Sequence, residues 1–173
     1  MLPEPVWKGS PNFWPGRQGL RPIAIVIHTM GGSLAGTDGW FANPSSQVSA
    51  HTGVGLQGER HRYVRFEDRA WANGILEPGN LWAKIGGASN PNNFTLSIET
   101  EDLGDPTMPV DELQYNAVLA EAKAMQATHP GMTWLLRHAD ISPASRRNCP
   151  GDRWVASGRL LELADALGLK RLS

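Results

Sequence analysis

The sequence predicts a single domain of the α/β class. Segments with the apolar runs or the two-residue alternation of β-strands are interleaved with segments of helical periodicity. The 173 residues are the length of one domain, and we find no internal repeat or linker. The hydrophobic content of 40%, the charged content of 19% and the net charge of −1 are those of an ordinary globular protein, and no charge block indicates binding to nucleic acid.

The first 22 residues hold five prolines together with Trp7 and Trp14. Proline disfavours helix, so we expect an extended N-terminal arm over residues 1–22, packed through its aromatic side chains on a domain of residues 23–173. Residues 1–5 lack the features of a secretory signal, and no run reaches membrane-spanning length. We therefore expect cytoplasmic synthesis and no membrane insertion. The single cysteine excludes an internal disulfide.

Residues 23–27 form a short apolar run rich in β-branched side chains, as expected of a strand buried on both faces. His28 follows it and precedes a turn containing two glycines. A short helix at residues 38–42 and strands at residues 47–53 and 62–66 are expected next. His51 is interpreted as a hydrogen-bonded structural residue. Other basic side chains are interpreted as parts of the solvated surface: Arg60, His61, Arg62, Arg65, Arg69 and His129.

Residues 71–93 form a long segment rich in glycine and proline, and loops of this length are usually functional or disordered. Trp71 and Trp82 are candidate apolar walls of a substrate groove, and Asn73 is a candidate polar contact in it. Packing in the core is the alternative for Trp71. These three side chains are therefore candidate substrate-binding residues.

Residues 94–101 alternate as a strand does, with Leu96 and Ile98 on one face and Ser97 and Glu99 on the other. A glutamate in a central strand is costly to bury unless it is paired or used. Glu99 therefore lies either on an exposed face or in a site where it acts as a general base.

The C-terminal half predicts a helix over residues 111–129, a strand over residues 133–136 that delivers His138 at its end, and a last helix over residues 152–167. The inward-facing positions expected in the two helices are Leu113, Ala117, Ala120 and Ala124, then Leu160, Leu163 and Leu167.

The segment 137–151 holds His138, two arginines and the only cysteine, Cys149. Thiolate and neutral imidazole are ligands that Zn²⁺ prefers, and a catalytic site uses three protein ligands. His28, at the end of another buried strand, is the natural third ligand. The alternatives are that Cys149 is a small buried hydrophobic residue or that it is a nucleophile with His138 as its base.

Four segments, taken together and in this order, resemble the type-2 zinc N-acetylmuramoyl-L-alanine amidases, a family that includes phage endolysins, anhydromuropeptide amidases and peptidoglycan recognition proteins. The segments are residues 25–29, 48–51, 90–99 and 138–151. The resemblance extends over residues 20–160, about four fifths of the chain, and the ordered set is far more specific than any one segment.

The resemblance implies a central mixed sheet flanked by helices and one zinc ion held by His28, His138 and Cys149. It implies hydrolysis of the amide between N-acetylmuramic acid and L-alanine of the stem peptide, with Glu99 as general base and Arg147 stabilising the oxyanion. Many members carry a tyrosine where this chain has Ala50, which places more of the base catalysis on Glu99.

Within that resemblance we expect a monomeric, bacteriolytic peptidoglycan hydrolase of the phage endolysin type, acting on the cell wall after release. The alternatives are a cytosolic anhydromuropeptide-recycling amidase and a non-catalytic peptidoglycan-binding module. Cys149 argues against the last, since non-catalytic recognition proteins typically lack the cysteine ligand.

Overall fold

A computed structural model of the protein describes residues 2–105 and 107–172. Met1, at the start of the expected arm, and Pro106 and Ser173, within the expected domain, lie outside the described residues. Among the residues described, no helix is both long and apolar enough to cross a membrane.

The core of the molecule is a six-stranded sheet. Its strands in spatial order are β1 (Val6–Trp7), β5 (Arg60–Arg62), β4 (Thr52–Val54), β7 (Thr95–Thr100), β3 (Ala24–Thr29) and β8 (Trp134–Arg137). Strand β5 runs antiparallel to β4, and every other neighbouring pair is parallel, so the sheet is mixed, as predicted. A separate two-stranded ribbon pairs β2 (Phe13–Trp14) with β6 (Arg69–Ala70).

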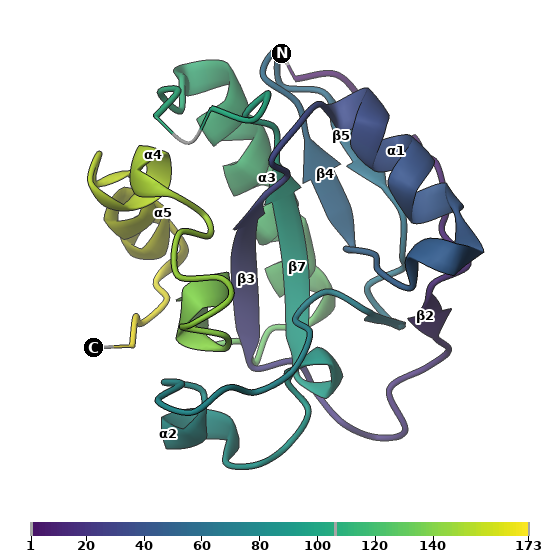
Figure 1. Ribbon diagram of the computed structural model, residues 1–173, viewed down its shortest axis with the longest axis vertical. Helices are drawn as coiled ribbons and strands as arrows, with labels where there is room; N and C mark the ends of the chain where they lie inside the picture. Colours follow the sequence, from purple (N-terminus) through teal and green to yellow (C-terminus); the bar gives the residue numbers. More distant parts are fainter. Residues whose placement is uncertain (1, 106, 173) are drawn as a thin grey trace.

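Helices flank this sheet, which confirms the predicted fold class. They are α1 (Leu34–Ala42), α2 (Ala83–Gly86), α3 (Glu112–Thr128), α4 (Asp152–Val155) and α5 (Arg159–Leu167), with 3-10 turns η1 (Pro44–Ser46), η2 (Pro91–Asn93) and η3 (His138–Asp140). Helix α3 lies behind β3 and β7 in Figure 1, and α1 lies beside β4 and β5. The light-green segment after β8 lies beside β3 and leads toward α4 (Figure 1).

The side chains of β3 and β7 alternate between two cores. Ile25, Ile27, Leu96 and Ile98 belong to the larger core, which also contains side chains of α3 and α5, whereas Val26 belongs to a second core. Full burial of one such side chain contributes roughly 1.5–3 kcal/mol, so a one-residue slip of either strand is strongly disfavoured. The polar side chains that alternate with these apolar ones therefore point to the face of the sheet opposite α3.

Helix α3 begins where the sequence predicted, because Asp111 Oδ1 accepts the backbone N–H of Gln114 at 2.9 Å. The predicted inward face is wrong at Leu113, which is 49% exposed. Gln114 is fully buried in its place, and its side chain accepts a hydrogen bond from Arg153 at 2.5 Å. When the inner face of a helix includes a buried polar residue of this kind, the pattern of apolar residues alone does not identify that face.

The expected solvated surface of arginines is also wrong in part. Glu121 of α3 is fully buried and pairs with Arg60 at 3.2 Å and with Arg62 at 3.0 Å. Arg69 is 8% exposed and donates to the carbonyl oxygen of Gly16 at 2.9 Å. Arg60 and Arg62 thus pair with a buried carboxylate and Arg69 with a main-chain oxygen, contacts that sequence alone did not reveal.

Three predicted boundaries differ from the structure. The strands expected at residues 47–53 and 62–66 are shorter and shifted, because β4 and β5 pair over three residues each and a tight turn at Gly55 joins them. Helix α1 begins before residue 38 because Ser33 caps it. The expected last helix is two helices, since Gly158 has a left-handed φ of 80° that interrupts it.

The segment before residue 22 is held by specific contacts. It supplies β1 at the edge of the main sheet and β2 in the ribbon, two strands that the sequence did not predict. The ring of Trp14 lies 5.4 Å from that of Trp71, and Arg65 lies over the ring of Trp7. Arg17 is 7% exposed and its Nε donates to the carbonyl oxygen of Phe66 at 3.0 Å.

Candidate functional site

His28 and His138 meet at the carboxyl ends of neighbouring parallel strands. His28 is the penultimate residue of β3, and His138 follows β8 directly. Both side chains are buried, and their Nδ1 atoms lie 3.0 Å apart. The sequence predicted this meeting of two histidines, because the carboxyl ends of adjacent parallel strands share one edge of a sheet.

Both rings are neutral near pH 7. Burial lowers the pKa of His28 well below its usual value and lowers the pKa of His138 to about 4. Nε2 of His138 lies 3.2 Å from the carbonyl oxygen of Asn73, which can only accept a hydrogen bond. The proton of this ring therefore sits on Nε2, and the lone pair on Nδ1 points at His28.

Cys149 completes a cluster in which one ligand atom from each of His28, His138 and Cys149 lies within 4.8 Å of the others. Its Sγ accepts the backbone N–H of Thr29 at 3.4 Å, and burial raises the pKa of the thiol to about 12. Two imidazole nitrogens and one sulfur form a donor set that suits Zn²⁺. A cation there would lie against the histidine lone pairs and favour the thiolate, so the residues fit a metal ion.

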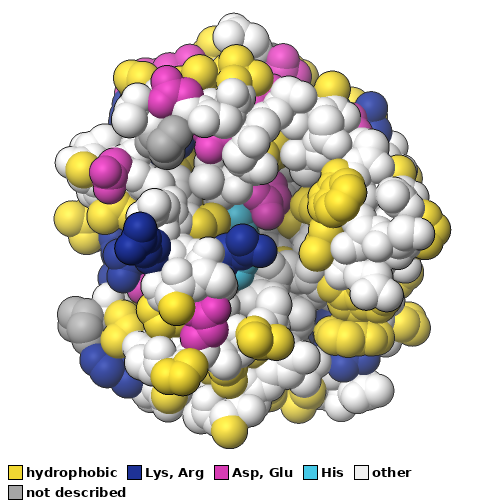
Figure 2. Space-filling view, viewed as in Figure 1, with side chains coloured by type: hydrophobic (Ala, Val, Ile, Leu, Met, Phe, Trp, Pro, Cys, Tyr) yellow, Lys and Arg dark blue, Asp and Glu magenta, His cyan; other side chains and the backbone are white. Residues whose placement is uncertain are grey.

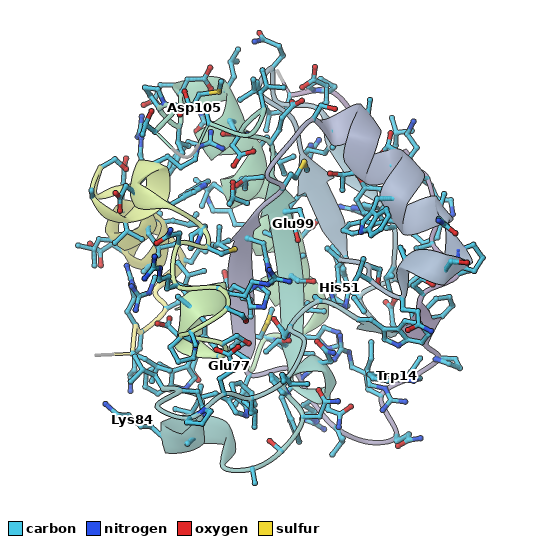
Figure 3. The ribbon with its side chains drawn as sticks, in the orientation of Figure 1. Trp14, His51, Glu77, Lys84, Glu99 and Asp105 are labelled. Carbon is cyan, nitrogen blue, oxygen red and sulfur yellow. The ribbon has the colours of Figure 1, made fainter. Side chains whose placement is uncertain are left out.

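Glu99 lies beside this cluster because β3 and β7 pair His28 with Glu99 in parallel register. Its Oε1 is 3.8 Å from Nδ1 of His28, and its Oε2 is buried without a hydrogen-bond partner among the described residues. Burial raises the pKa of this carboxyl to about 8, and the nearby charge of Asp102 adds to the rise. Figure 3 shows Glu99 projecting from the middle of the sheet. Of the two interpretations of Glu99, the exposed face is wrong.

A positive charge also reaches the cluster. Burial has the largest effect on both groups: it raises the pKa of Glu99 and lowers the pKa of His138. The positive charge of Arg146 has a smaller effect and lowers both pKa values. Figure 2 shows a cationic side chain beside a histidine and an acidic side chain in the hollow of this face. The sequence analysis named the adjacent Arg147, and both arginines line the cavity at the cluster. No sequence signal separates two consecutive arginines, because the loop geometry decides which one reaches the site.

Glu77 holds the loop that carries these arginines. Its carboxylate accepts the backbone N–H groups of Ala144 at 2.6 Å and Ser145 at 3.1 Å. The side chain of Ser145 lowers the pKa of Glu77 most, and the backbone hydrogen bonds from Ser145 and Ala144 lower it further. Glu77 lies below the sheet centre in Figure 3. Two loops distant in sequence are thereby joined next to Arg146.

The cluster opens into a cleft formed by two adjoining cavities. A cavity of about 520 Å³ contains His28, Glu99 and Cys149 in its lining. A second cavity of about 290 Å³ shares Trp71 and Arg146 with the first. Arg147 lines only the larger cavity. Trp71 therefore lies on the cleft wall where the sequence placed it.

The other two candidate substrate contacts are not at the cleft surface. Trp82 is fully buried in the second core, and its Nε1 donates to the carbonyl oxygen of Ser89 at 3.0 Å. Asn73 is also fully buried, with its amide nitrogen donating to Asn92 and Thr95. The expectation that these two side chains contact substrate at the cleft surface is therefore wrong, because both are buried inside the protein.

The remaining histidines lie outside the cluster. His51 is 1% exposed and hydrogen-bonded to Ser97 at 3.0 Å, as expected of a structural residue. His61 is not a free surface residue, because its Nδ1 lies 2.9 Å from Asp38. His129 likewise contacts the carbonyl oxygen of Phe66 at 2.9 Å.

Residues 18–152 match the family model of the N-acetylmuramoyl-L-alanine amidases, Amidase_2. The matched region includes the three clustered residues and Glu99, and it covers well over half of the chain. The protein therefore belongs to this amidase family, as the resemblance indicated.

Individual relatives match a shorter part of this chain than the family model does. N-acetylmuramoyl-L-alanine amidase A of Achromobacter lyticus is 32% identical over 96 residues, covering 56% of this chain and 46% of the relative. 1,6-anhydro-N-acetylmuramyl-L-alanine amidase AmpD of Escherichia coli (strain K12) is 31% identical over 106 residues, covering 61% and 52%. The chain thus spans about half the length of the curated relatives it matches. A crystal structure of a selenomethionine AmpD derivative superposes with a TM-score of 0.74 at 25% identity, covering 94% of this chain and 96% of that chain.

The buried carboxyl of Glu99 predicts a pH-dependent effect on the stability of metal-free protein. The unfolded carboxyl ionises at pH 4.5, whereas the folded one has a pKa of about 8, so the folded state binds more protons between these values. Stability should fall as pH rises through this window, and Glu99→Gln should remove the loss. Urea unfolding of both proteins from pH 4.5 to 8.5 should show a stability advantage of Glu99→Gln that grows with pH; a constant difference would contradict the prediction.

Proposed function

We propose that the protein is a zinc-dependent N-acetylmuramoyl-L-alanine amidase whose catalytic domain comprises residues 23–173. The observation that carries the proposal is the convergence of His28, His138 and Cys149 within 4.8 Å, beside Glu99 on the floor of a cleft. Family membership supports the reaction class, and the donor set supports zinc. The scissile bond is the amide between the lactyl group of N-acetylmuramic acid and L-alanine.

His28, His138 and Cys149 would hold the zinc ion, which when bound would supply a Lewis acid for the scissile carbonyl and for the attacking water. Glu99 accepts the proton of the attacking water and delivers it to the leaving amine. Its position suits both steps, because one oxygen faces His28 and the other is buried without a partner among the described residues. A neighbouring cation lowers the pKa of Glu99, which keeps the base ionised near neutral pH.

Arg146 supplies a second positive charge to the cleft. The tetrahedral carbon formed by attack carries an oxyanion, and a guanidinium on the wall stabilises that charge with N–H donors. Because Arg146 acts electrostatically on Glu99 and His138, we assign this role to Arg146 and keep Arg147 as the neighbour to be compared.

The geometry disfavours a cysteine hydrolase. A thiolate–imidazolium pair requires a low pKa at the cysteine and a raised one at the histidine. Burial instead raises the pKa of Cys149 to about 12 and lowers that of His138 to about 4. A purely peptidoglycan-binding module of the same fold has no use for Glu99 in a buried position at this cluster.

Two substrates fit the cleft. The printed name of the AmpD relative supports a soluble 1,6-anhydromuropeptide, as in a cytosolic recycling amidase. The two adjoining cavities favour a longer ligand, as for an endolysin that cuts intact wall, because one ligand can cross both. Comparing release of L-alanyl peptides from purified sacculi and from soluble anhydromuropeptide, at matched concentrations of cleavable bonds, separates the two roles.

Metal dependence tests the proposal directly. We expect one zinc per chain, loss of hydrolysis after treatment with a strong chelator and recovery on adding Zn²⁺. Cys149→Ser should weaken zinc affinity by more than the roughly 10–100-fold cost of changing an outer-shell residue, because it removes a ligand atom. Asn148→Ala, at the exposed neighbouring position, is the matched control and should bind zinc normally. Full zinc occupancy of Cys149→Ser under competition with chelator would rule out this ligand set.

Glu99→Gln should keep zinc binding and lose activity. The amide keeps the shape of the side chain but cannot accept the proton, so kcat should fall by about 10²–10⁴. Glu67→Gln makes the same change of charge at an exposed position and should leave kcat unchanged. The measurement is steady-state hydrolysis of a muramyl peptide together with zinc titration. Near-normal turnover by Glu99→Gln would remove Glu99 from the mechanism.

Replacing the two arginines separately tests their assignment. Arg146→Ala should lower kcat by roughly 10²–10³, the cost of losing one oxyanion donor, whereas Arg147→Ala should leave it within about threefold. Arg146→Lys should recover part of the loss, since it restores the charge but not the planar donors. Equal losses at the two positions, or a larger loss at Arg147, would reverse the assignment.

A further inference from the structure

Asn73 lies next to both histidines of the cluster although it does not line the cleft. Its backbone carbonyl oxygen lies 3.2 Å from Nε2 of His138. Its side-chain oxygen Oδ1 is buried and has no hydrogen-bond partner among the described residues, and the same is true of Nε2 of His28. Burial has the largest effect on the pKa of His28 and lowers it, whereas the nearby Asn73 side chain raises it.

The orientation of the Asn73 amide is fixed by its nitrogen. Nδ2 donates to Oδ1 of Asn92 at 2.9 Å and to Oγ1 of Thr95 at 2.8 Å, which uses both of its N–H groups. A flipped amide would turn its oxygen against Oδ1 of Asn92, an acceptor. Oδ1 is therefore the atom presented to His28, and it can only accept.

This arrangement determines where each imidazole carries its proton. A ring that donates from Nε2 has its lone pair on Nδ1, the atom that binds metal when the other nitrogen is engaged by a carbonyl. Nε2 of His138 lies 3.2 Å from the main-chain oxygen of Asn73, and the side-chain oxygen of Asn73 is the acceptor available to the unpartnered Nε2 of His28. Both Nδ1 lone pairs then face each other across 3.0 Å, an arrangement that a shared cation stabilises.

We propose that Asn73 is the positioning residue of the metal centre, holding His28 through its side-chain oxygen and His138 through its backbone carbonyl, so that both rings present Nδ1 to one ion. This inference rests on the proposed function, because it assumes that these rings bind a metal. Substitution of the side chain should release His28 alone, since the backbone carbonyl remains.

The test compares Asn73→Ala, Asn73→Asp and Thr95→Val. Asn73→Ala should weaken zinc affinity about 10–100-fold, as expected for loss of an outer-shell partner, when free Zn²⁺ is set by a competing chelator. Asn73→Asp keeps an acceptor for His28 but turns its second oxygen against Oδ1 of Asn92, so it should recover only part of the affinity lost in Asn73→Ala. Thr95→Val removes one partner of the Asn73 amide nitrogen but leaves Oδ1 in place, so it should bind zinc like the unaltered protein.

A spectroscopic measurement separates positioning from general damage. Two-bond ¹⁵N–¹H spectra of the metal-free unaltered protein should show the Nε2–H tautomer at His28 and at His138. In Asn73→Ala the His28 signals should change to a mixture of tautomers while those of His138 persist. Should Asn73→Ala fail to fold, the His28 tautomer of the unaltered protein still decides: an Nδ1–H tautomer overturns the inference.

The outcomes distinguish this inference from the proposed function. Unaltered protein that binds no zinc would contradict the proposed function itself. Unaltered protein that binds zinc through His28, His138 and Cys149, with equal affinity in Asn73→Ala, would overturn only the positioning role. Equal losses of affinity in Asn73→Ala and Thr95→Val would also overturn it, because they would indicate general disruption of the buried polar cluster.

Discussion

The parallel pairing of β3 with β7 on one edge and with β8 on the other is the constraint on which the site depends. The first pairing places His28 beside Glu99, and the second pairs Ile27 with Arg137, so that His138 emerges one residue later at the same edge. Alternate side chains of β3 and β7 are buried against α3, so the register cannot slip without exposing them. The packing of the hydrophobic core therefore fixes the relative positions of His28, Glu99 and His138.

That geometry gathers groups whose charged forms are unstable in isolation. Burial lowers the pKa of His28 and raises those of Glu99 and Cys149, so each group prefers its neutral form in the metal-free protein. A single divalent cation would favour the neutral form of the imidazole, because it binds the lone pair, and the ionised forms of the carboxyl and the thiol, because it stabilises their negative charge. The same burial that disfavours the separate charges therefore favours their combination around one ion.

The features predicted from sequence are those determined locally. The apolar run of β3, the alternation around Leu96 and Ile98 and the capped start of α3 each depend on neighbours in the chain. The meeting of His28 and His138 also followed, because strand ends of a parallel sheet share an edge.

The features that sequence missed depend on packing between distant segments. Trp82 looked like a groove wall but fills a core built by β3 and β8, and the choice between Arg146 and Arg147 depends on how one loop is tied to another. Glu121 on the inner face of α3 was missed because its arginine partners lie on a strand about 60 residues earlier. His28 and Glu99 therefore lie on strands of the sheet and His138 directly follows one, whereas Cys149 and much of the cleft wall belong to loops, two of which Glu77 joins. Loops of this kind can vary in sequence without disturbing the sheet, so the cleft walls can change while the positions of His28 and Glu99 stay fixed.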